Sequence, residues 1–147
     1  MKEIQGNIWD YHDKGYWIVI TTNGTVRKDG ACVMGRGVAL EAKQRFPKFP
    51  FELGKRIRED GNIPHHFYNY SLISLPVKHS WYERADLVLI ESSVKSLVKV
   101  CSNFLSARER EVVCMVRPGC GNGGLDWKDV KPILEHWLDD KFIVVQK

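Results

Sequence analysis

Lys78 is the residue of this sequence with the clearest potential for covalent chemistry. It follows the apolar residues of the segment LPVKHSW, residues 75–81. A lysine amine that has lost its proton attacks a sugar carbon to form a Schiff base, and a protonated amine contacts phosphate. A lysine after a strand is also often a solvated surface residue, so the residues alone leave both interpretations open.

Two glycine-rich segments have the composition of anion-binding loops. In the first, residues 23–40, Gly35 and Gly37 flank Arg36 just before an expected helix. The free N–H groups and the dipole of a first helical turn favour an anion, and Arg36 adds a guanidinium. A surface turn that needs glycine for positive φ explains the same residues. The segment is neither a Walker loop nor a dinucleotide fingerprint, because the spacing of both motifs is missing.

The second segment, PGCGNGGLDW at 118–127, carries four glycines between Gly119 and Gly124. Glycine carries a chain-entropy cost, so this density indicates a backbone that wraps a ligand; a flexible lid over a pocket without phosphate is the alternative. Cys120 has no histidine close in sequence, so we interpret it as a small filler beside the ligand and not as a nucleophile. Together the two segments predict a diphosphate held from two sides.

The elements that would position these residues alternate between strand and helix. Short, nearly all-apolar runs suit strands covered on both faces, and we predict them at 2–7, 16–22, 67–75, 111–116 and 142–145. Helical spacing predicts helices at 37–46, 48–60, 86–105 and from an Asp126 N-cap to about 138. This alternation is typical of a three-layer α/β/α sandwich. Ligands of such folds bind beyond the carboxyl ends of strands, here after Thr22 and Val116.

Length and composition exclude several classes of protein. The 147 residues predict one domain, 1–147, which needs no disulfide or metal to bury a core. A net charge of +4 does not by itself indicate a protein that coats nucleic acid. The sequence has neither an apolar run long enough for a membrane span nor a signal-peptide core, so we expect no membrane partner and a cytoplasmic location.

The cysteines and histidines predict neither a metal site nor a cofactor. The four cysteines match no metal-ligand spacing, and in a cytoplasmic protein we expect them as reduced thiols. The adjacent His65 and His66 are expected as an exposed pair.

With both glycine-rich segments in view, the sequence resembles the macro domain family, whose members bind ADP-ribose in an α/β/α fold with a mixed, mostly parallel sheet. The resemblance covers nearly all of the chain. The most similar branch contains terminal ADP-ribose protein hydrolases and the DarG-type antitoxins, which remove ADP-ribose from DNA. The resemblance rests on the following residues and segments: Gly6-Asn7-Ile8, Asn23, CVMGRGVAL (32–40) with Lys43 and Phe46-Pro47, LPVKHSW and PGCGNGGLDW.

The resemblance implies a role for each matching residue. Lys78 would attack the anomeric carbon of the distal ribose, after which water frees ADP-ribose. Asn7 replaces the aspartate that usually binds the adenine amino group, Ile8 would donate its backbone N–H nearby, and Asn23 would contact the distal ribose. The residues implied to wrap the ribose and diphosphate are Val33, Met34, Gly35, Arg36 and Gly37 on one side and Gly119, Cys120, Gly121, Asn122, Gly123, Gly124 and Leu125 on the other.

Two departures from the family pattern bear on the substrate. Gly123 stands where the protein hydrolases carry an aspartate, which favours the DNA-directed enzymes. The extra residues Arg27-Lys28-Asp29 contact either nucleic acid or, as we favour, solvent. The leading hypothesis is an ADP-ribosyl hydrolase that needs no cofactor and acts on modified DNA, with single-stranded DNA as a candidate, or on modified protein. The alternatives are a non-catalytic ADP-ribose reader and an ADP-ribose 1″-phosphate phosphatase; the sequence identifies no protein partner.

Overall fold

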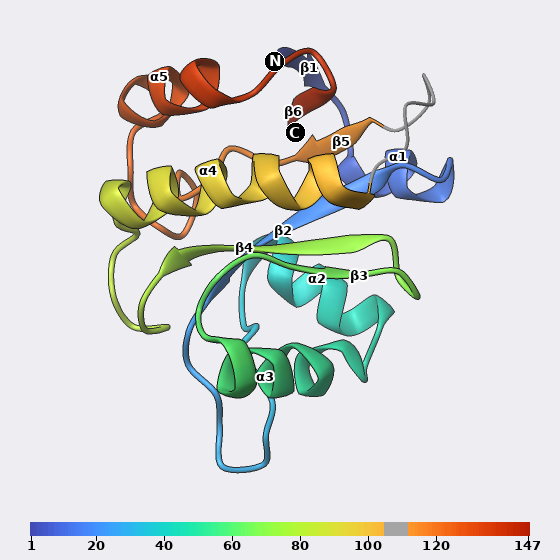
Figure 1. The fold of residues 1–147 in the computed structure, drawn as a ribbon, viewed down its shortest axis with the longest axis vertical. Helices are drawn as coiled ribbons and strands as arrows, with labels where there is room; N and C mark the ends of the chain where they lie inside the picture. Colours follow the sequence, from blue (N-terminus) through green and yellow to red (C-terminus); the bar gives the residue numbers. More distant parts are fainter. Residues whose placement is uncertain (105–111) are drawn as a thin grey trace.

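The computed structural model describes residues 1–104 and 112–147, which build one six-stranded sheet (Figure 1). The strands are β1 (Lys2–Gln5), β2 (Trp17–Asn23), β3 (His65–Phe67), β4 (Leu72–Lys78), β5 (Val113–Met115) and β6 (Phe142–Gln146). Their order across the sheet is β1-β6-β5-β2-β4-β3. Every neighbouring pair is parallel except β3 and β4, which are antiparallel. The predicted mixed, mostly parallel sheet is confirmed.

Helices cover both faces of the sheet. They are α1 (Ile8–Asp13), α2 (Gly37–Arg45), α3 (Phe49–Asp60), α4 (Leu87–Phe104) and α5 (Trp127–Trp137). Alternate residues of β2 point to opposite faces, as period-two geometry requires: Val19 packs in one core with α4 and α5, and Ile18 and Ile20 pack in another with α1, α2 and α3. The two cores give the three-layer α/β/α arrangement that the sequence predicted.

The strand predicted at 67–75 is wrong, because this region forms two antiparallel strands. The chain turns between β3 and β4, where Ser71 adopts a φ of 54°. β4 then runs through Pro76, which was expected to end it. Proline is tolerated there because β3 pairs only with Leu72–Ser74, so Pro76 lies on a free edge on that side. Its carbonyl accepts a hydrogen bond from Ser93 Oγ at 2.7 Å.

Other boundaries differ from the prediction in ways that have local causes. Helix α1 was not predicted, because a six-residue helix is too short to show a period. Asn7 caps it by accepting a hydrogen bond from the Trp9 N–H at 3.0 Å. Leu105 and Glu111, the predicted ends of a helix and a strand, lie outside the described residues.

The expected exposure of His65 is wrong. Its side chain is buried in β3, with Nε2 at 3.0 Å from the Gly61 carbonyl. All four cysteines are free thiols. Within 1–104 and 112–147, the helices are too short or too polar to cross a membrane.

Candidate active site

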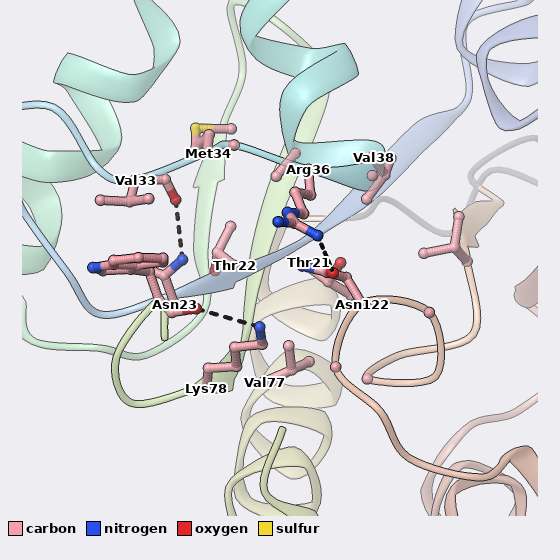
Figure 2. Close-up of a pocket in the computed structure, with 18 of the residues that line it drawn as sticks. Thr21, Thr22, Asn23, Val33, Met34, Arg36, Val38, Val77, Lys78 and Asn122 are labelled. Atoms are coloured by element: carbon pink, nitrogen blue, oxygen red, sulfur yellow. Dashed lines mark hydrogen bonds between the residues drawn. The ribbon is translucent and has the colours of Figure 1, made fainter. Parts of the chain in front are cut away.

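A cavity of about 260 Å³ opens at the carboxyl ends of β2 and β4, beyond the end of β5 (Figure 2). Both glycine-rich segments reach it, as their positions after strands predicted. It is lined by Thr21, Thr22, Asn23, Val33, Met34, Gly35, Arg36, Gly37, Val38, Ala39, Val77, Lys78, Trp81, Val116, Arg117, Gly119, Gly121, Asn122 and Gly123.

Asn23 holds the first glycine-rich segment in place. Its Nδ2 donates to the Val33 carbonyl at 3.0 Å, and its Oδ1 accepts from the Thr25 N–H at 2.9 Å. The segment then enters α2 at Gly37, with Arg36 as the N-cap residue and no side chain capping the helix. The first turn of α2 also has no acidic residue. This helix start, on the wall of the cavity, therefore suits an anion.

The second glycine-rich segment is compact, which argues against a flexible lid. A Cβ on Gly123 would lie 2.5 Å from the Gly119 oxygen and 2.8 Å from Ala85 Cβ. The side chains of Cys120 and Leu125 pack against the core formed with α4 and α5. The segment thus turns these two side chains inward, while Asn122 and the backbone of Gly119, Gly121 and Gly123 line the cavity. It also leaves no room at position 123 for an aspartate unless the backbone moves.

Three glycines present bare backbone to the cavity from opposite walls. A Cβ added to Gly35, Gly37 or Gly121 would have no other atom within 4 Å. Packing therefore does not require glycine at these positions, although Gly37 also has a φ of 59°. Arg36 spans the space between the walls, since its Nη1 donates to Asn122 Oδ1 at 3.3 Å (Figure 2).

Lys78 reaches into the cavity from the end of β4. Its Nζ donates to the Trp81 carbonyl at 3.4 Å, and its own carbonyl accepts from Asn62 Nδ2 at 3.1 Å. The side chain is half-buried and its amine faces the space between the glycine-rich segments (Figure 2). The charged residues that line the cavity are Lys78, Arg36 and Arg117, all cations. The site therefore places an amine in a pocket suited to an anionic ligand.

The chain after Lys78 ties the two glycine-rich segments together. The Gly24 N–H donates to the His79 carbonyl at 3.1 Å, and the Ala85 N–H donates to the Gly123 carbonyl at 3.0 Å. Asp86 closes this loop at the start of α4. The hydrogen bond from His79 Nε2, 3.0 Å away, is the main reason that the pKa of Asp86 is lowered. Both glycine-rich segments and the lysine thus share one hydrogen-bonded frame.

Eleven of the sixteen residues implied by the family resemblance line the cavity, and five do not. Asn7 and Ile8 belong to the start of α1, where Ile8 is buried. Cys120 and Leu125 face the core, and burial raises the pKa of the Cys120 thiol. Gly124 lies against Arg84, whose Nη2 donates to its carbonyl at 2.7 Å.

Sequence reasoning missed eight lining residues, six of them within two residues of a predicted one. They are Thr21, Thr22, Val38, Ala39, Val77, Trp81, Val116 and Arg117. Trp81 stands in the same LPVKHSW segment as Lys78, which was the available signal. Arg117 also lines a second hollow beside β1 and β6, near the end of β1 that leads to Asn7. Across the described part of the chain, no cluster of His, Cys, Asp or Glu is arranged to hold a metal ion.

Comparison with known proteins shows sequence and fold relatives of one kind. No protein-family model matches the chain. A Mycobacterium tuberculosis protein named DNA ADP-ribosyl glycohydrolase is 31% identical over an alignment of 115 residues; the match covers 67% of this chain and 30% of that protein. The chain thus spans less than a third of the length of this curated relative.

Solved structures show the same fold. The macrodomain of Thermus aquaticus DarG superposes with a TM-score of 0.73 at 24% identity, covering 99% of this chain and 97% of that one. Thermosipho africanus DarTG in complex with ADP-ribose superposes with a TM-score of 0.68 at 20% identity, covering 88% of this chain and 37% of that one. The strand order, the two glycine-rich walls and these similarities agree: this chain is a macro domain of the DarG type.

Proposed function

We propose that these 147 residues act as one macro domain that binds ADP-ribose and, through Lys78, releases it from a modified macromolecule. The observation that carries the proposal is the position of the Lys78 amine, in a cavity walled by two glycine-rich segments and lined by cations. Bare backbone at Gly35 and Gly121 supports close approach of a diphosphate from two sides. The start of α2 adds the favourable end of a helix dipole.

The same geometry suggests how the parts of ADP-ribose are distributed. The diphosphate would lie between the glycine-rich segments and the distal ribose beside Lys78. The adenosine would extend along Arg117 toward the hollow beside β1 and β6. Asn7 Oδ1 already accepts from the Trp9 N–H, but an amide oxygen has a second lone pair with which to accept from the adenine amino group.

The proposed reaction begins with Lys78 in its neutral form. Its amine bonds to the anomeric carbon as the bond from that carbon to the modified group breaks, and the leaving group takes up a proton. The resulting glycosylamine opens to an imine. Water then adds to the imine carbon, the bond to the lysine nitrogen breaks, and free ADP-ribose leaves. Each turnover consumes one water and needs no oxidant or reductant.

We further propose DNA as the modified macromolecule. The name of the M. tuberculosis relative refers to DNA, and the crowded backbone around Gly123 leaves no room for the aspartate of the protein hydrolases. Single-stranded DNA, the cytoplasmic location and the absence of a cofactor and of a membrane partner stay predictions of the sequence.

The test measures binding and turnover separately. Calorimetry with ADP-ribose tests the pocket, and release of ADP-ribose from modified oligonucleotide and modified protein tests the reaction. Lys78→Met should abolish release and retain binding. Lys128→Met, on the exposed surface of α5 outside the cavity, should retain both release and binding. Borohydride should trap the imine as an adduct on Lys78, which peptide mass spectrometry locates.

Other outcomes would identify a different function or refute the proposal. Binding without release from any linkage would identify a reader. Release of phosphate from ADP-ribose 1″-phosphate alone would identify the phosphatase. No binding of ADP-ribose would refute all of these functions, and full activity of Lys78→Met would refute the role of the lysine.

A further inference from the structure

Two large aromatic side chains stand exposed beside the mouth of the cavity. Trp81 is 54% exposed and lines the cavity, and its neighbour Tyr82 is 72% exposed. Both follow Lys78 within four residues in the loop between β4 and α4. Single exposed aromatics are common on protein surfaces, but this pair adjoins the proposed nucleophile.

The backbone under the pair is held in place. The Trp81 N–H donates to Thr25 Oγ1 at 3.0 Å, and the Trp81 carbonyl accepts from Lys78 Nζ at 3.4 Å. A turn closes next to it, where the Glu83 N–H donates to the Ser80 carbonyl at 3.1 Å. The rings are therefore presented from a fixed frame, and a group that contacts Trp81 lies next to the reacting amine.

The orientation of the rings favours separated bases over a duplex. The ring centroids of Trp81 and Tyr82 lie 5.9 Å apart, and the ring planes meet at 89°. Two bases that stacked on the two faces would lie at right angles to each other. Bases in a duplex are parallel, whereas a single strand can splay successive bases apart.

The charges around the pair suit a phosphate backbone. Lys28 is exposed on the loop that contains Thr25, and Arg84 follows Tyr82 by two residues. Arg27 is partly neutralised by Asp29, 3.4 Å away, and the same loop as the aromatic pair carries the acidic residues Glu83 and Asp86. The cavity that Trp81 lines adds Lys78, Arg36 and Arg117, so the cations among these residues outnumber the acidic side chains Asp29, Glu83 and Asp86. A cationic groove combined with aromatic side chains on which bases stack is the usual surface for single-stranded nucleic acid.

We propose that Trp81 and Tyr82 form a stacking surface for bases of single-stranded DNA that flank the ADP-ribosylated nucleotide. This inference rests on the proposed function, because it assigns the part of the substrate that remains outside the cavity. Trp81 would contact the modified base or its immediate neighbour, and Tyr82 the next base. The surface would thereby select an oligonucleotide over a shorter substrate.

The test compares two substrates of different length. One is a single-stranded oligonucleotide of about ten nucleotides with one ADP-ribosylated base, since single-strand sites span roughly that length, and the other is the ADP-ribosylated nucleoside. Wild type should favour the oligonucleotide in kcat/KM. Trp81→Ala and Tyr82→Ala should each lose about tenfold on the oligonucleotide, near the lower end of what one base stack contributes, with a smaller loss on the nucleoside.

The control is Tyr68→Ala. Tyr68 is a similarly exposed tyrosine, at 64%, in the turn between β3 and β4, at the end of β4 opposite Lys78. Its removal should leave both substrates unchanged. Tyr82 does not line the cavity, so Tyr82→Ala should also bind free ADP-ribose as wild type does.

The outcomes separate this inference from the proposed function. If ADP-ribose binds and is released but Trp81→Ala and Tyr82→Ala process both substrates as wild type does, the stacking surface is refuted and the proposed function stands. A Tyr68→Ala variant as defective as Tyr82→Ala also refutes it. If ADP-ribose does not bind wild type, both proposals fall together. A loss of kcat/KM in Trp81→Ala and Tyr82→Ala that is larger on the oligonucleotide than on the nucleoside supports the stacking surface.

Discussion

Gly121 and Gly123 lie two residues apart in one glycine-rich segment, and replacing each by alanine should have opposite consequences. Gly121 lines the cavity, and a new methyl group there meets no atom within 4 Å. Its φ lies outside the left-handed region, so alanine should stabilise the fold by about 0.4–1 kcal/mol by restricting the unfolded chain. If ADP-ribose occupies that space, the methyl group should weaken binding.

The size of both effects follows from the contacts. Forcing a methyl group into filled space typically costs about 1–3 kcal/mol, which corresponds to a dissociation constant roughly 5–150-fold larger for Gly121→Ala. At Gly123 the methyl group would lie 2.5 Å from a backbone oxygen. Gly123→Ala should therefore lose about 1–3 kcal/mol of unfolding free energy.

Urea unfolding and calorimetry with ADP-ribose together decide the matter. Gly121→Ala should unfold no earlier than wild type and bind more weakly. Wild-type affinity in a folded Gly121→Ala variant would refute the claim that this backbone contacts the ligand. Wild-type stability in Gly123→Ala would refute the packing described for the segment.

Three further predictions concern other parts of the molecule. Gly54→Ala should lower the free energy of unfolding by about 1–3 kcal/mol despite the better helix propensity of alanine, because its Cβ would collide with the Gly30 carbonyl of the first glycine-rich segment; an unchanged urea midpoint would contradict this. Cys120 should be the first thiol labelled by iodoacetamide in the native protein, since burial raises the pKa of the other three to about 11 or 12; peptide mapping that finds another cysteine labelled first would refute it. Burial also lowers the pKa of His65. As pH falls, the His65 imidazole is therefore protonated in the unfolded chain before it is protonated in the folded protein. The contribution of His65 to the free energy of unfolding is complete above pH 6.5, the ordinary pKa of a histidine. It declines as pH falls from there toward the lowered pKa of the folded state. Urea midpoints measured from about pH 7.5 to about pH 5.5 should fall less in His65→Gln, and equal falls would count against the burial argument.

Long apolar patterns made most of the fold predictable from the sequence. The run at 17–23 and the helical spacing in 49–60 and 87–104 match β2, α3 and α4 closely, because burial of such patterns dominates local preference. The break between β3 and β4 was not predictable in this way. Residues 67–75 are rich in strand-forming types, and the turn places Ser71 at positive φ without a glycine or proline to mark it.

The candidate site was predictable in its backbone and less so in its side chains. Glycine spacing identified both walls, because a dense run of glycines indicates a backbone that approaches a ligand closely. The sequence does not say which way a neighbouring side chain turns, however. Cys120 and Leu125 stand among the glycines and yet pack against the core. Trp81 turns toward the cavity because Thr25, distant in sequence, holds its backbone there.

The strand order also sets when the sheet is completed during synthesis. Among the six strands of this sheet, β6 comes last in the sequence and lies between β1 and β5. β1 comes first of the six, but in the described sheet its only neighbour is β6, with Lys2 in register with Ile143. Contacts this distant in sequence form late and slowly. A nascent chain therefore carries β1 without its partner until Phe142–Gln146 leave the ribosome, and a chain truncated before Phe142 never pairs it.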